Sequence, residues 1–141
     1  MKKSKLLMVI LCLVVVLSMF SACGIQKAPP LSDKYVESDV TAKAEKFVSL
    51  VNDGKAAETY DLMGDTLKKS ITKEKLVEAL NNGLDKIGKY ESSTYSVFGN
   101  SSNDLEGDLA TCVVVATHEK GKKQYTLTYN EKMELVGVYV K

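Results

Sequence analysis

Apolar residues in the first half of the chain recur with the period of a helix. Five of them occupy positions i, i+4, i+7, i+8 and i+11: Val40, Ala44, Phe47, Val48 and Val51. Such positions share one face of a helix. Ser38 or Asp39 can cap the start, and Gly54 permits the left-handed turn that ends a helix. The pattern predicts an amphipathic helix over residues 39–52.

Two further helical segments follow before the pattern changes. A short helix is expected over residues 56–63, with one more turn over 66–70. Thr72 can cap the next helix, whose apolar stripe runs along Leu76, Leu80, Leu84 and Ile87 until Gly88 stops it. Gly83 is a weak point inside that helix, because glycine costs about 1 kcal/mol relative to alanine there.

After Gly88 the apolar period becomes two, which indicates strands. Short polar turns separate four such segments, at residues 90–98, 109–117, 124–129 and 133–140. The second is a β-branched run typical of a well-buried strand. Helices followed by strands with short turns predict an α+β fold, with N-terminal helices on one face of a four-stranded antiparallel meander. The expected shape is an open cone.

The N-terminus has the organisation of an export signal. Lys2, Lys3 and Lys5 precede an uncharged apolar run from Leu6 to Phe20, which closes with Ser21, Ala22 and Cys23. A basic start and an apolar core of this length are typical of a cleavable signal peptide. The closing residues resemble the bacterial lipobox, which implies cleavage between Ala22 and Cys23 and a diacylglyceryl group on the Cys23 thiol.

Two other interpretations of this segment stay open. Residues 6–25 are long enough to span a bilayer as an uncleaved anchor, and a plain secretory signal cut elsewhere is the other. The lipoprotein hypothesis divides the chain into a signal peptide (1–22), a lipidated tether (23–38) that contains Pro29-Pro30, and a domain (39–141). It places the domain on the extracytoplasmic face of the cell membrane, held there by the lipid.

Three segments of the domain carry a resemblance to known proteins: residues 44–54, 71–88 and 135–138. Through them the domain, over about residues 40–140, resembles the nuclear-transport-factor-like (cystatin-like) α+β superfamily. More narrowly, it is similar to small uncharacterised domains on bacterial lipoproteins and ahead of α/β-hydrolase domains. The resemblance implies a cone-like sheet wrapped around helices, and it supplies no catalytic residues.

Charge and composition exclude one class of partner. Every one of the 19 basic residues is lysine, and the 18 acidic residues nearly balance them. Without arginine forks, and with a net charge of only +1, a phosphate-tracking nucleic-acid surface is not expected. Lysine without arginine is typical of AT-rich genomes, which indicates a low-GC Gram-positive bacterium.

Residues with reactive side chains form no recognisable catalytic or metal-binding motif. His118 is the only histidine and is expected at the surface end of a strand, and Cys112 in an apolar strand is expected to be a buried hydrophobe. Residues 102–108 follow the start of a calcium-loop spacing, but Val113 stands where that loop needs a glutamate. No metal, cofactor or catalytic residue is therefore assigned.

Tyrosines supply the candidate pocket. Tyr125 and Tyr129 share a strand face, and with Tyr95 they can line a concave pocket and orient a ligand. The first hypothesis is a non-catalytic module that binds a small molecule, a peptide or an envelope protein, with homodimerisation through the sheet as a further option. The alternative is a small enzyme that uses pocket carboxylates and tyrosines. A deep pocket with a carboxylate beside a tyrosine favours the enzyme, and an interior filled by Phe47, Leu80 and Leu127 argues against it.

Overall fold

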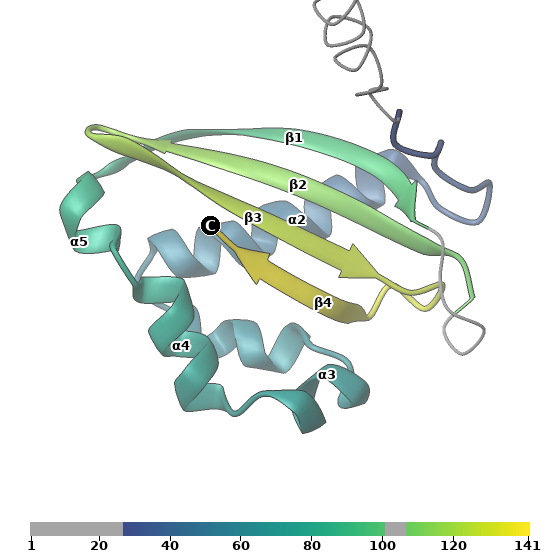
Figure 1. Ribbon diagram of the computed structural model, residues 1–141, viewed down its shortest axis with the longest axis horizontal. Coiled ribbons are helices and arrows are strands. Elements are labelled where there is room, and N and C mark those ends of the chain that lie inside the picture. Colours follow the sequence, from purple (N-terminus) through teal and green to yellow (C-terminus); the bar gives the residue numbers. More distant parts are fainter. Residues whose placement is uncertain (1–26, 101–106) are drawn as a thin grey trace, which may run out of the picture.

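Helices precede strands along the chain, as predicted (Figure 1). The computed structural model describes residues 27–100 and 107–141. The helices are α2 (Glu37–Asn52), the 3₁₀ helix η2 (Ala56–Leu62), α3 (Asp65–Ser70), α4 (Lys73–Asn81) and α5 (Leu84–Ile87). The strands are β1 (Tyr90–Asn100), β2 (Leu109–His118), β3 (Gly121–Tyr129) and β4 (Leu135–Val140). They form one antiparallel sheet in the order β1-β2-β3-β4, so the α+β meander is confirmed.

Helix α2 packs across one face of the sheet (Figure 1). Its buried stripe is the one that the periodicity predicts: Val40, Ala44, Phe47, Val48 and Val51. On β2 the alternate residues Ala110, Cys112, Val114 and Ala116 are buried against this side. The core therefore lies between α2 and the inner face of the sheet, as expected where period-two and period-3.6 stripes meet.

The single helix expected from Thr72 to Gly88 is wrong in one respect, because the structure divides it into α4 and α5. Gly83 takes a left-handed conformation with a φ of 77°. The backbone of the preceding residue, Asn82, is already non-helical. The helical stripe continues through the break, since Leu84 and Ile87 both remain half-buried.

The outer face of the sheet is polar and β-branched. Thr126 on β3 lies between Val113 on β2 and Tyr139 on β4, and Tyr139 is 62% exposed. A homodimer through this face stays a prediction. No helix in the described part of the chain is long and apolar enough to cross a membrane.

Residues 29–35, here called the strap, pack onto the domain although the sequence analysis assigned them to the tether. The backbone N–H of Gly99 donates to the carbonyl of Pro29 at 2.9 Å. Tyr35 is only 6% exposed, and its hydroxyl donates to the carbonyls of Asp108 (2.5 Å) and Tyr129 (3.3 Å). The packed body thus begins near Pro29, before the predicted boundary at residue 39, because a buried aromatic ring and backbone hydrogen bonds outweigh the extended preference of Pro29-Pro30.

Candidate functional site

The interior of the cone is filled. Phe47, Leu80 and Leu127 are each 0% exposed. Tyr125 lies among them, with its ring against Phe47 in an edge-to-face contact (centroids 6.3 Å apart). Its hydroxyl is buried without a hydrogen-bond partner, and burial raises the pKa of Tyr125 to about 12. The Tyr125 side chain is itself 0% exposed.

The three tyrosines predicted to line a pocket have different surroundings in the structure. Tyr125 and Tyr129 do share the inner face of β3, and Tyr95 on β1 aligns with Tyr125 through Val114. Tyr95 is half-buried and is not among the residues that line the cleft described below. Only Tyr129, 3% exposed, borders a large open space.

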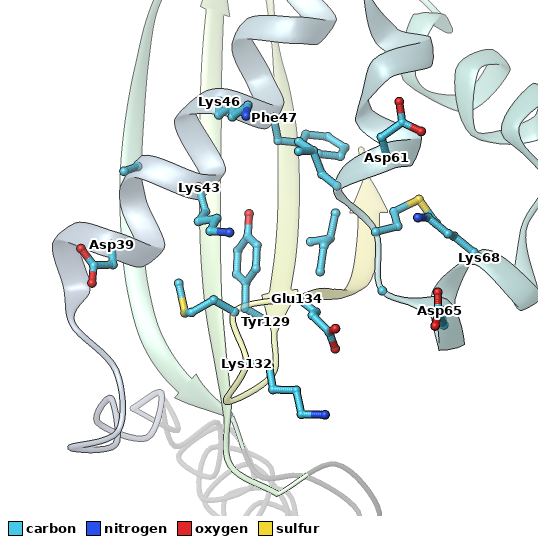
Figure 2. A pocket seen from close by; sticks show the side chains of 16 residues that line it. Asp39, Lys43, Lys46, Phe47, Asp61, Asp65, Lys68, Tyr129, Lys132 and Glu134 are labelled. Carbon is cyan, nitrogen blue, oxygen red and sulfur yellow. The ribbon is translucent and has the colours of Figure 1, made fainter.

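That space is a cleft of about 780 Å³ between α2, the η2–α3 connection and the β3–β4 turn (Figure 2). It lies at the side of the cone. The residues that line it are Asp39, Ala42, Lys43, Lys46, Phe47, Asp61, Leu62, Met63, Gly64, Asp65, Lys68, Tyr129, Lys132, Met133, Glu134 and Leu135. We call it the side cleft.

Backbone contacts join the two halves of the cleft floor. Met63 pairs with Leu135 in an isolated parallel bridge, and the N–H of Gly64 donates to the carbonyl of Leu135 at 2.8 Å. Met63, Leu135 and Phe47 are all buried. The floor is therefore a rigid apolar surface that belongs to the core itself.

The β3–β4 turn forms the lower edge of the cleft. The Asn130 side chain accepts from the backbone N–H groups of Lys132 (3.1 Å) and Glu134 (2.9 Å). Within this turn Met133 has a φ of 59°, the one positive φ of a non-glycine residue in the described ranges. Such a conformation costs a residue with a side chain about 1–2 kcal/mol. Met133 keeps this unfavourable conformation, and its side chain is half-buried where it lines the cleft.

Each wall of the side cleft carries charges of both signs (Figure 2). On α2, Asp39 lies one turn before Lys43, and Lys46 follows. On the opposite wall, Lys68 lies with Asp61 and Asp65. Figure 2 also shows the Lys43 ammonium reaching toward Tyr129 across the floor. Among the described residues, none of these six charged side chains has an ion-pair partner within 4 Å. Their charges are therefore open to a ligand.

Tyr129 is a hydrogen-bonding group in this cleft and a poor base. Burial raises its pKa far above that of an exposed tyrosine. The phenol is therefore neutral at physiological pH and can donate a hydrogen bond.

The sequence analysis missed a buried lysine. Lys123 is 6% exposed, and its ammonium donates to the carbonyls of Leu80 (2.6 Å) and Asn82 (2.7 Å) at the end of α4. A cation that binds the last carbonyls of a helix also interacts favourably with the helix dipole. The only sequence signal was a lysine at an inward position of an alternating strand.

His118 is not at the surface, so that expectation is wrong. It is 5% exposed, its Nδ1 donates to the Gly88 carbonyl at 3.1 Å, and its ring contacts Tyr90 edge to face. The chain returns from α5 beside the end of β2 and covers the ring. Cys112 is buried as predicted, and burial raises the pKa of its thiol to about 11. A thiol of that pKa is unreactive at neutral pH.

Three expectations lie wholly or largely outside the described residues. The signal peptide (1–22), with its cleavage site between Ala22 and Cys23, is one, and lipidation of Cys23 is the second. The third is the failed calcium loop, of which only Gly107 and Asp108 are described. Within residues 27–100 and 107–141, no three His, Cys, Asp or Glu side chains lie close enough together to hold a metal ion.

A family model matches residues 44–138, most of the chain. The chain belongs to this family, described as "Protein of unknown function (DUF3887)". The matched range of DUF3887 includes the sheet and most of the side cleft, whereas the strap precedes it. A comparison with curated proteins gives no match.

One solved structure shares the fold of this DUF3887 chain. It is an NMR structure of a protein from Ruminococcus gnavus ATCC 29149, with a TM-score of 0.66 and 19% sequence identity. The similarity covers 79% of this chain and 96% of the other. At that identity it supports the fold alone.

Proposed function

We propose that this protein is a membrane-anchored extracytoplasmic lipoprotein whose DUF3887 domain binds a short peptide in the side cleft. The leader supports the first part, because a basic start, an apolar core and small residues before Cys23 are what lipoprotein export and lipidation need. The lysine-only basic composition supports a low-GC Gram-positive source. Two acyl chains on Cys23 provide stable attachment where a single chain is marginal.

The observation that carries the second part is the side cleft itself. Its volume of about 780 Å³ is in the range of ligand pockets, about 300–1,000 Å³. Its apolar floor suits an aliphatic or aromatic side chain. The lysines and aspartates, present on both walls, suit a ligand with both an acidic and a basic group. A short peptide combines these features, and a strongly charged ligand of one sign does not.

The resemblance to the nuclear-transport-factor-like superfamily fits this proposal only in outline. In our proposal the ligand lies beside the cone and not within it, because the interior is filled by Phe47, Leu80 and Leu127. The same packing argues against the alternative, an acid–base enzyme with a tyrosine and a carboxylate in a deep central pocket. Tyr129 with its raised pKa is a donor to a ligand group and a weak proton acceptor.

Intact mass of protein extracted from membranes tests the anchor. The wild-type chain is expected to begin at Cys23 with a diacylglyceryl adduct, and the Cys23→Ala variant to lack it. An intact leader with unmodified Cys23 would show a signal anchor, and a different cleaved N-terminus would show a secreted protein.

Native mass spectrometry of the same extracts tests the cleft. Ala42 is exposed and lines the side cleft, so Ala42→Trp is expected to fill the space and remove a bound peptide. Ala57 is exposed on η2 and does not line the side cleft, so Ala57→Trp is the matched control and should retain the ligand. Equal ligand retention in both variants, or no peptide in the wild type, would contradict peptide binding at this site.

A further inference from the structure

The strap and the side cleft lie at the same end of the domain. Lys34 of the strap forms ion pairs with Glu131 (2.6 Å) and Asp108 (3.4 Å). Glu131 belongs to the β3–β4 turn, which carries Lys132 at the cleft edge. Helix α2, which forms one cleft wall, begins two residues after the strap ends. Figure 1 shows this end opposite the β2–β3 turn and α5.

The packed strap shortens the free chain between Cys23 and the domain. Six residue steps separate Cys23 from Pro29. Whatever their conformation, they span at most about 22 Å, since an extended residue covers at most about 3.6 Å. A tether that stayed free until residue 39 would reach about 58 Å by the same geometry.

The hydrogen bond from Gly99 to Pro29 fixes where the chain leaves the domain. Only glycine fits at position 99 beneath the strap, because a Cβ there would clash with the backbone carbonyl of Pro30. The exit point is therefore set by backbone contacts at the end of β1 and not by flexible surface side chains.

We propose that the strap holds the cleft-bearing end of the domain against the bilayer, so that the side cleft takes its ligand from chains at the membrane surface. This inference rests on the proposed attachment at Cys23. The described charged residues at this end are of both signs (Lys27, Asp33, Lys34, Asp108, Glu131 and Lys132). Their mixture gives no strong attraction to anionic lipid, so the short covalent link sets the orientation and salt should not change it.

Energy transfer from single tryptophans measures this orientation, because the chain contains no tryptophan. Residues 23–141 are coupled through Cys23 to maleimide-lipid in phosphatidylcholine vesicles that also contain dansyl-labelled lipid, in a Cys112→Ala background so that Cys23 is the single thiol. Chemical coupling makes the result independent of lipidation in the cell, which the intact-mass experiment tests separately.

Lys132→Trp reports the cleft end, and Lys120→Trp reports the β2–β3 turn at the other end of β3. Nine residues of β3 separate the two turns by about 30 Å. Transfer from Lys132→Trp is expected to exceed that from Lys120→Trp at least about twofold, at low and at high salt. Equal transfer from both positions, or the reverse order, would overturn the proposal.

Two variants test whether the strap, and not adsorption to the bilayer, orients the domain. Gly99→Ala is expected to displace the strap and reduce the difference between the two tryptophans by at least half, with circular dichroism to verify the fold. A Gly/Ser insertion of six residues between residues 26 and 27 leaves every described contact in place and should also lower the transfer from Lys132→Trp. A difference that survives both changes would show that adsorption, and not the strap, orients the domain.

Discussion

The contacts of individual buried polar side chains could not be predicted from the sequence pattern. Lys123 sits at an inward position of β3, where alternation predicts an apolar residue, and it satisfies two carbonyls of a helix more than 40 residues away. No local pattern announces such a contact, because the partner is defined only after the helix and the sheet have packed. The same holds for His118, which is covered by the return of the chain from α5.

Replacement of Lys123 by methionine should destabilise the domain. The variant keeps an apolar stem of similar length but leaves the carbonyls of Leu80 and Asn82 without their donor, which costs about 1–3 kcal/mol. Urea unfolding followed by circular dichroism measures the change. The matched control is Lys122→Met at the exposed neighbouring position, expected within about 0.5 kcal/mol of wild type. Equal stability of the two variants would show that Lys123 does not cap α4.

Tyr125→Phe should have the opposite effect. The Tyr125 hydroxyl is buried without a partner, so its removal relieves a desolvated group and should raise the free energy of unfolding at pH 7 by up to about 1 kcal/mol. Tyr139→Phe, at a 62% exposed position, serves as the control and should leave stability unchanged. A loss of more than 1 kcal/mol in Tyr125→Phe would reveal a hydrogen-bond partner for this hydroxyl.

At the scale of elements, periodicity located α2, the stripe shared by α4 and α5, and the four strands, and local breaks set their ends. Gly83 interrupts the stripe of one predicted helix without changing its buried face, so α4 and α5 differ from the prediction in geometry and not in packing. The side cleft was beyond this kind of reasoning. Its walls come from α2, the η2–α3 connection and a turn, and their separation depends on the Met63–Leu135 bridge.

The β3–β4 turn offers a test of backbone strain beside that cleft. Met133→Gly and Met133→Ala both remove the methionine side chain, but only glycine adopts a φ of 59° without penalty. The glycine variant should therefore be more stable than the alanine variant by about 1 kcal/mol. Thermal or urea unfolding of the two proteins gives the difference directly. If alanine is equal or better, the turn has another conformation in solution.

At the scale of the whole molecule, the α+β meander and its core could be predicted because both depend on repeated apolar spacing. The position of the domain relative to its anchor could not. Residues 29–35 read as a linker, since two adjacent prolines favour extended chain and one aromatic residue makes no pattern. Only the folded surface shows that Tyr35 has a buried site and that Gly99 leaves room for the backbone of the strap.

The buried thiol and phenol groups of the core should make the folded state less stable at alkaline pH. Burial raises the pKa of the Cys112 thiol to about 11 and that of Tyr125 to about 12, and it raises the pKa of Tyr129 as well. Each group holds its proton in the folded state at a pH where the unfolded chain releases it. The stability that these groups contribute is complete below their unfolded pKa values, near 9 and 10, and is lost as the pH rises through the folded values.

Lys123 acts in the other direction, because burial lowers its pKa and stability then increases with pH below about 10.5. One lysine opposes these three groups, and burial raises the pKa values of Tyr35 and Tyr95 as well. The free energy of unfolding should therefore fall by several kcal/mol between pH 9 and pH 12. Urea unfolding across this range measures the fall. Tyr125→Phe should reduce it by about 2–3 kcal/mol, the equivalent of two pKa units, whereas Tyr139→Phe should not. A stability that stays flat to pH 12 in the wild type would mean that these side chains are open to solvent, and that the filled interior which leaves the side cleft as the binding site does not persist in solution.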